Sequence, residues 1–280
     1  MALMVFFLLA SLFGLFIFFN NHPQNTSISD EYLTDRSGNV RTFLPSSRGE
    51  VVHHTYYSLS YIEQHEQAEW TAHLLSKEML RIPNVPRSNY FNPDPSVSTG
   101  SAVHADYSGS GYTRGHLVPA GDMAHHKIAM EESFYMSNMS PQLRAFNNGV
   151  WRELEENVRD WAFSNGSVYV ITGPVLNDSI RKKIGKNRVS VPDSFFKVVL
   201  SHNEKASKAV AFIIPNDRSE QPIQQYMVSV DEAERITGID FFCHLLDDVV
   251  EEQIESALDK AAWPVSEKRF QLRLSKWNNE

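Results

Sequence analysis

The chain has 280 residues, of which 42% are apolar and 21% charged, so it has enough apolar material for one large or two small globular domains. Its formal net charge of −8 argues against broad, non-specific attraction to polyanions, and the lack of an internal repeat argues against a solenoid. The single cysteine, Cys243, excludes an internal disulfide, and we expect it to be a buried, inert thiol.

The N-terminal stretch Met1–Phe19 carries no charged side chain and is close to the ~20 residues needed to span a bilayer. It lacks the basic start and the small-residue cleavage site of a secretory signal. We therefore expect an uncleaved signal anchor; a removed signal peptide is the alternative, and a buried core helix is a weaker one. The rest of the chain is then exported and is membrane-anchored, periplasmic or extracellular. A bacterial envelope is favoured, because a mitochondrial presequence would be rich in Arg and this stretch has none.

Residues 20–47 are polar and predict a linker, which leaves one domain over residues 48–280. At its start, β-branched and aromatic residues predict a strand over 51–62. Residues 66–80 follow, where the spacing of Trp70, Leu74 and Leu75 predicts a helix.

A proline-rich loop over 82–95 carries Arg87 and precedes a helix predicted over 146–163 from the spacing of its apolar residues. Strands are predicted over 167–176, 195–201 and 208–215. Ser229 and Gly238 are the expected caps of a short helix. Strands and helices interleave without a regular βα period, so we expect an α+β fold with a mainly antiparallel central sheet flanked by helices.

Charge is distributed unevenly along the chain. Residues 231–259 are crowded with acids, whereas residues 181–188 (RKKIGKNR) are strongly basic. Each run taken alone is best interpreted as solvated surface. The basic run nevertheless leaves open a local positive surface that meets a polyanion.

The segment YTRGHLVPAGDM (Tyr112–Met123) places Arg114 and His116 two residues apart, on one face if the segment is a strand. A neutral histidine suits a general base, and a neighbouring cation lowers its pKa and keeps it neutral. The same guanidinium can bind a phosphate oxygen, and Gly115 between them permits close approach of a ligand. A structural histidine is the alternative.

In FNNGVWRELEE, Asn147 and Glu155 lie two helical turns apart on one side of the predicted helix. An amide oxygen and a carboxylate are oxygen donors of low total charge, which suits Mg²⁺ with its retained waters. A helix N-cap for Asn147 and a surface charge for Glu155 are the alternatives.

Taken together, TRGH, SNMSPQ and FNNGVWRELE resemble the DNA/RNA non-specific endonucleases, the ββα-metal (His-Me finger) family of endonuclease G-like enzymes. The three motifs stand in the family's order and spacing. The resemblance extends from about Val51 to beyond VYVITGPVL, more than half of the chain. It implies a ββα-metal catalytic motif embedded in the domain.

The resemblance also implies roles for individual residues. His116 corresponds to the general base that activates water, Asn147 to the direct protein ligand of Mg²⁺ (with Mn²⁺ as the alternative metal), and Glu155 to the acid that orients a metal-bound water. Position 113, usually Asp in the family, is Thr113 here. We expect it to face away from His116 and to tune the site without abolishing activity.

Three further positions follow from the same resemblance. Asn138 corresponds to an asparagine that supports the active site, Arg114 to the arginine of the motif, and Arg87 to an upstream phosphate-binding arginine. The implied enzyme is a Mg²⁺-dependent endonuclease of DNA and RNA that is largely insensitive to sequence and leaves 5′-phosphate ends. Monomers and homodimers both occur in the family, so the oligomeric state stays open.

Two alternative functions are a nucleic-acid-binding module and a zinc hydrolase. A catalytically weakened nucleic-acid-binding module of the same fold would be expected to lack the base or the metal ligand, yet His116, Asn147 and Glu155 are all present. A zinc hydrolase would need metal-binding spacing, and the adjacent pairs at 53–54 and 125–126 do not provide it.

Overall fold

The computed structural model describes residues 43–203 and 206–280, and its centre is a seven-stranded sheet in the order β1-β2-β3-β6-β9-β10-β11. All neighbouring strands in this sheet run antiparallel. Its strands are β1 (Glu50–His53), β2 (Ser58–Ile62), β3 (Gln67–Ser76), β6 (Ser167–Pro174), β9 (Ser194–Asn203), β10 (Ala206–Pro215) and β11 (Met227–Val228). Two small hairpins are β4 (Thr113–His116) with β5 (Met139–Gln142), and β7 (Lys183–Ile184) with β8 (Val189–Ser190).

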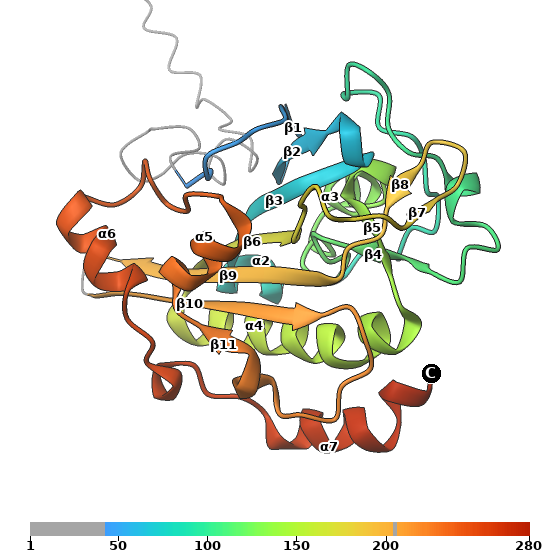
Figure 1. Ribbon diagram of the computed structural model, residues 1–280. Helices are drawn as coiled ribbons and strands as arrows, with labels where there is room; N and C mark the ends of the chain where they lie inside the picture. Colours follow the sequence, from blue (N-terminus) through green and yellow to red (C-terminus); the bar gives the residue numbers. More distant parts are fainter. Residues whose placement is uncertain (1–42, 204–205) are drawn as a thin grey trace, which may run out of the picture.

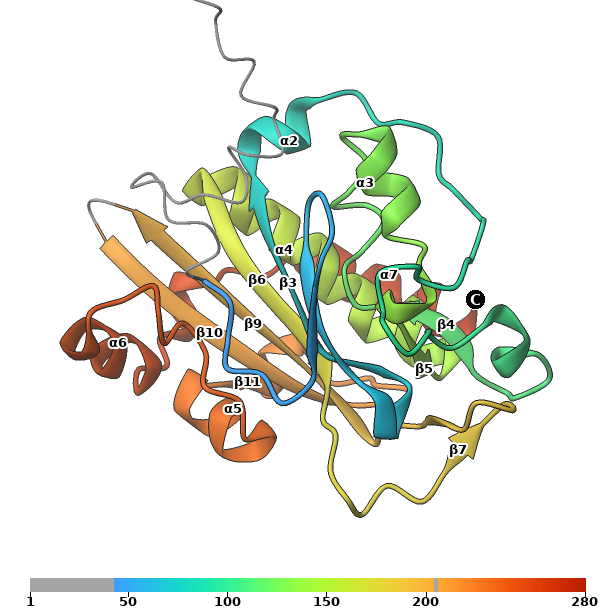
Figure 2. The same ribbon diagram turned by 90° about the horizontal axis from the view of Figure 1, so that it is seen from above.

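Helices cover both faces of the sheet (Figure 1, Figure 2). On one face lies α4 (Arg152–Asn165), and on the other lie α5 (Val230–Thr237) and α6 (Asp248–Glu255). The remaining helices are α2 (Lys77–Arg81), α3 (Lys127–Glu132) and α7 (Glu267–Ser275). The expected α+β fold with an antiparallel central sheet is confirmed.

Side-chain alternation along the central strands builds a core on each face. On β9, Val198 and Leu200 join the core beneath α5 and α6, whereas Val199 joins the core beneath α4. On β10, Ala211 joins the core beneath α5 and α6, and Phe212 joins the core beneath α4. A strand buried on both faces has a nearly continuous apolar run, which is why the sequence signal for β9 and β10 was strong.

The helix predicted over 66–80 is wrong. Residues 67–76 form β3, and only Lys77–Arg81 is helical. Trp70 contributes to one core and Leu75 to the other, so apolar residues on both faces produced a spacing that also fits a helix. Pairing with β2 on one side and β6 on the other determines the extended conformation.

The single strand predicted over 51–62 is instead the β1–β2 hairpin. The backbone N–H of His54 donates to the carbonyl of Tyr57 at 2.9 Å and closes the turn between the strands. The helix near residue 230 is confirmed: Ser229 accepts from the Glu232 N–H at 3.2 Å, and Gly238 adopts a left-handed conformation with φ of 69°.

Packing on the domain begins before residue 48, inside the segment assigned to the linker. Phe43 is buried in the core beneath α5 and α6, and Trp70 Nε1 donates to the Ser46 carbonyl at 3.0 Å. The anchor predicted at Met1–Phe19 lies outside the described residues. Within 43–203 and 206–280, no helix has both the length and the apolar character to cross a bilayer. Cys243 is half-buried, and burial raises the pKa of its thiol to about 11, so an unreactive thiol is expected.

Candidate active site

The β4–β5 hairpin and the start of α4 form the expected ββα unit. His116 pairs with Met139 across the hairpin. A Cβ on Gly115 would lie 2.0 Å from Gln142 Oε1, so glycine at this position lets the Gln142 side chain pack against β4. After β5 the chain enters a helical segment, Phe146–Trp151, which is kinked at Gly149 (φ −95°, ψ −109°) and leads into α4. The kink lies between Asn147 and Glu155, so the regular helical spacing expected between these two residues is interrupted.

Two aromatic rings hold the basic residues of the site together. The edge of the His116 ring contacts Phe134 at 4.7 Å between centroids, and Phe91 lies at 6.1 Å. The Arg114 guanidinium lies 4.4 Å from the centre of the Phe91 ring, and that of Arg87 lies 5.1 Å from the centre of Phe134. Stacking on a ring face positions a guanidinium while leaving N–H donors for a phosphate.

His116 is held in the neutral form. Burial first, and then the charges of Arg87 and Arg114, lower its pKa to about 3. Its Nε2 atom is buried and has no hydrogen-bond partner among the described residues. A neutral imidazole with an unpaired nitrogen can accept a proton, which a general base requires.

Asn147 is oriented by Thr113. The Thr113 hydroxyl donates to the Gln142 carbonyl at 2.9 Å and accepts from Asn147 Nδ2 at 3.0 Å. Because the amide nitrogen is engaged, the side-chain oxygen of Asn147 points away from Thr113 and remains a donor atom for a cation. The N-cap alternative for Asn147 is wrong, since the kinked helical segment begins after Ala145. An amide oxygen is among the oxygen ligands that suit Mg²⁺.

Glu155 is half-buried and sits among basic groups, so it is not a simple surface charge. Burial raises its pKa to about 7, while the charges of Lys197 and Arg159 oppose that rise. Arg87 acts on Glu155 as well as on His116. One guanidinium therefore lies close enough to influence both the predicted base and the predicted acid.

Asn138 acts through the backbone. Its side chain is fully buried, donates to the carbonyls of Val118 at 3.0 Å and Ser133 at 2.8 Å, and accepts from the Val118 N–H at 2.9 Å. Val118 follows His116 by two residues. Asn138 thus fixes the backbone beside His116 instead of presenting its amide to a substrate.

Lys197, Arg159 and Asp122 surround Glu155 electrostatically and are not predicted from the sequence. Lys197 is buried, donates to Thr172 Oγ1 at 2.6 Å, and has its pKa lowered to about 8 by burial. Arg159, four residues after Glu155 on α4, donates to Asp122 Oδ1 at 2.8 Å. The signal for Lys197 was present, because a lysine inside the apolar run FFKVVL needs a buried partner.

The model of the DNA/RNA non-specific endonuclease family matches residues 37–248. The chain is 37% identical over 215 residues to the mitochondrial nuclease EXOG of Danio rerio, covering 71% of this chain and 62% of that protein. The chain therefore spans about three fifths of the length of this relative.

Two other similarities agree. Human mitochondrial endonuclease G is 33% identical over 205 residues, which is 68% of each chain. A chain in the crystal structure of the EndoG/EndoGI complex superposes with a TM-score of 0.67 at 31% identity, covering 74% of this chain and 90% of that one. Residues 37–248, which the family model matches, contain β4, β5 and α4.

Proposed function

Because the chain belongs to the DNA/RNA non-specific endonuclease family, we propose that it hydrolyses phosphodiester bonds of DNA and RNA with Mg²⁺ and with His116 as the general base. The observation that carries this proposal is the buried, unpartnered Nε2 of a neutral His116 beside two guanidinium groups. This arrangement combines a proton acceptor with binding groups for a phosphate.

The residues divide the reaction between them. His116 accepts a proton from the water that attacks phosphorus in line with the leaving 3′ oxygen. Arg114 and Arg87 bind the non-bridging oxygens and stabilise the developing charge. Asn147 would hold the metal, which supplies charge neutralisation at the phosphate and at the leaving oxygen. Departure of the 3′ oxygen leaves a 5′-phosphate end.

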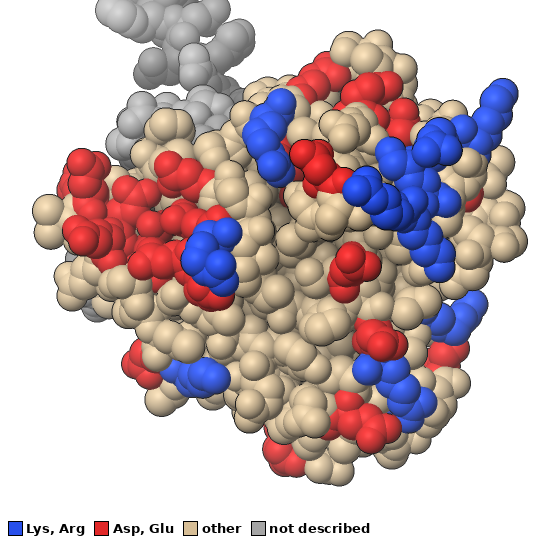
Figure 3. All heavy atoms as spheres, in the orientation of Figure 1, with Lys and Arg blue, Asp and Glu red and all other residues tan. Residues whose placement is uncertain are grey.

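The surface beside the hairpin suits a polyanion in spite of the net charge. The basic run 181–188 contains β7 and the turn that leads to β8, and Lys182 lies 4.7 Å from the centre of the Tyr112 ring, next to β4. Figure 3 shows Lys and Arg side chains gathered over this end of the molecule, with acidic side chains gathered over α5 and α6. Contacts to phosphate carry no base information, so cleavage should be largely insensitive to sequence.

Cleavage by the purified full-length chain should require a divalent cation and Asn147. With Mg²⁺ it should degrade supercoiled plasmid and RNA to fragments that carry 5′-phosphates, and EDTA should stop both reactions. Asn147→Ala should reduce the rate by about 10²–10³-fold, because several kcal/mol of charge neutralisation are lost. The adjacent Asn148→Ala is the matched control and should retain most activity.

Binding of DNA without cleavage under Mg²⁺ or Mn²⁺ would contradict this proposal. It would instead favour the binding-module alternative of the same fold. Equal losses in the two asparagine variants would contradict the role of Asn147.

Localisation in a bacterial envelope is a further part of the proposal, and it rests on the apolar stretch Met1–Phe19. The full chain expressed in a bacterium should fractionate with the membrane or the periplasm. A form that lacks residues 1–19 should stay in the cytoplasm, and equal fractionation of the two forms would contradict export by this segment.

A further inference from the structure

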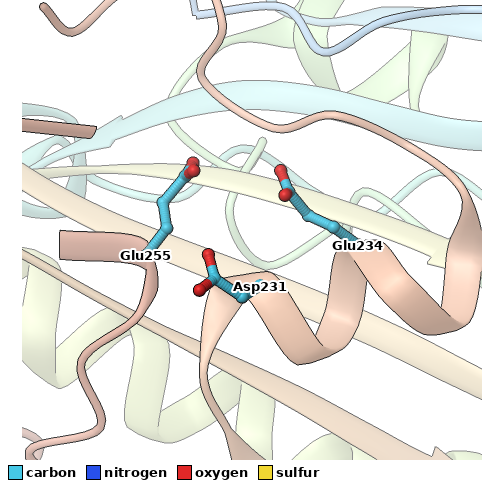
Figure 4. A group of neighbouring side chains, drawn as sticks. All are labelled: Asp231, Glu234 and Glu255. Atoms are coloured by element: carbon cyan, nitrogen blue, oxygen red, sulfur yellow. The ribbon is translucent and has the colours of Figure 1, made fainter. Parts of the chain in front are cut away.

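A group of carboxylates lies on the sheet face opposite α4, where α5 meets α6. Asp231 and Glu234 stand three residues apart on α5 and so project from the same side of the helix. Glu255 is the last residue of α6. One carboxylate oxygen of each residue lies within 4.8 Å of those of the other two, and Figure 4 shows the three side chains converging from the two helices.

Glu255 has surroundings that disfavour an isolated carboxylate. The residue is 5% exposed, and its Oε1 atom is buried without a hydrogen-bond partner among the described residues. It also ends α6, where the partial negative charge of the helix C-terminus repels an anion. A buried, unpaired carboxylate is costly unless a positive partner binds it.

The neighbouring residues add negative charge. Besides burial, the main electrostatic influences on Glu255 and Glu234 are other carboxylates, with Asp240 and Glu251 acting on both. Burial first, and then these carboxylates, raise the pKa of Glu255 to about 9 and that of Glu234 to about 7. The surroundings therefore favour a positive ligand that compensates several carboxylates together.

The nearest arginine on α5 is already engaged. Arg235 donates to both carboxylate oxygens of Glu232, at 2.7 and 2.6 Å. Glu234 is held in place differently, because its Oε1 accepts from the Phe241 N–H at 2.7 Å. One side chain of the group is thus already positioned for a ligand.

We propose that Asp231, Glu234 and Glu255 bind one divalent cation, Ca²⁺ in preference to Mg²⁺, and that this ion joins α5 to α6. Ca²⁺–oxygen bonds of ~2.3–2.6 Å allow two ligand oxygens on one ion to lie up to ~5 Å apart, which accommodates the observed 4.8 Å. Three carboxylates also suit Ca²⁺ better than Mg²⁺, which usually takes one or two. A zinc site would be expected to contain nitrogen or sulfur donors.

The site is independent of the ββα unit. It lies on the face of the sheet that α5 and α6 cover, whereas α4 covers the other face. Glu255 also lies beyond residue 248, where the match to the family model ends. The role that follows is structural: the ion fixes α6 on the edge of the domain and removes the repulsion among its ligands.

Thermal unfolding of the full-length chain, dialysed against EDTA and then against metal-free buffer, tests the site. The Asn147→Ala background excludes a contribution from a cation at the proposed catalytic site. Ca²⁺ at about 100 times its Kd should raise Tm by about 5–10 °C. Glu255→Gln should abolish this rise without lowering the Tm of the metal-free protein near pH 7, because Gln resembles the protonated carboxyl that a pKa of about 9 implies there. Glu252→Gln, an equal charge change on the exposed side of α6, should retain the rise.

Asp231→Asn provides a second variant at an exposed position, should Glu255→Gln fail to fold. It should weaken Ca²⁺ binding by about tenfold or more in a calorimetric titration, since ligand charge sets affinity. The absence of a Ca²⁺-dependent rise, or a rise unchanged in both ligand variants, would overturn the site. A larger rise with Mg²⁺ than with Ca²⁺ would overturn the calcium preference. These readouts do not depend on cleavage, so the site can fail while the proposed nuclease stands.

Discussion

His116→Ala should lower plasmid and RNA cleavage by about 10²–10⁴-fold, the usual contribution of a general base. The variant should still fold and bind DNA, because Arg114 and Arg87 remain on their aromatic rings. Initial rates with Mg²⁺, together with a binding titration in EDTA, separate the two effects. His202→Ala, which changes an exposed histidine on β9, is the matched control and should be as active as the parent.

The same site predicts an unusual pH dependence. The pKa of His116 is about 3, so His116 is neutral from pH 5 to 8 and should contribute no acid limb near 6.5. Glu155, with a pKa of about 7, is protonated below neutrality, and kcat/KM should therefore fall as pH decreases through about 7. Higher Mg²⁺ should move this limb to lower pH, because a cation stabilises the carboxylate.

Glu155→Gln should remove that acid limb along with part of the rate. The opposite result would be a fall in kcat/KM below pH 7 that persists in Glu155→Gln but is absent from the residual activity of His116→Ala. That result would assign the acid limb to His116 and contradict its neutral state.

Arg273→Ala should produce the largest loss of stability. Arg273 on α7 is fully buried, donates to Glu153 Oε2 of α4 at 2.5 Å and to the Gln221 carbonyl at 2.6 Å, and also contacts the Ser219 carbonyl. Its removal leaves the Glu153 carboxylate buried without its partner. The expected cost is about 3–5 kcal/mol in the free energy of unfolding, which lowers Tm by about 6–20 °C.

Lys268→Ala on the exposed side of α7 is the control for this experiment and should change stability by less than about 0.5 kcal/mol. Combining Arg273→Met with Glu153→Leu should recover much of the lost stability, because the double change leaves no buried charge. A single Arg273→Ala variant as stable as the parent would show that α7 does not support α4.

The C-terminal segment also packs against the candidate active site. A Cβ on Gly149 would lie 2.5 Å from Asn278 Oδ1, so this segment lies directly against the kinked helical segment that carries Asn147. The family match ends at residue 248. Residues beyond the matched region therefore support the geometry of the predicted metal ligand.

Much of the predicted site follows from short-range patterns. Arg114 and His116 share a face because side chains alternate along β4, and Asn147 leads into the helix that carries Glu155 because the apolar spacing marks α4. The caps of α5 are equally local. By contrast, the apolar spacing predicts a helix where β3 lies. Because β3 is buried on both faces, its apolar residues do not show the alternation that usually marks a strand.

The sequence by itself determined the fold class and the order of most elements, and it supplied the candidates for the general base and the metal ligand. These properties depend on residues a few positions apart, whose spacing is visible in the chain. Only the tertiary structure determined the environments that set their chemistry. His73 meets Asp122 across 49 positions, and Glu153 meets Arg273 across 120. Burial and charge pairing are properties of such long-range contacts, so the pKa values of His116 and Glu155 could not be predicted from spacing alone.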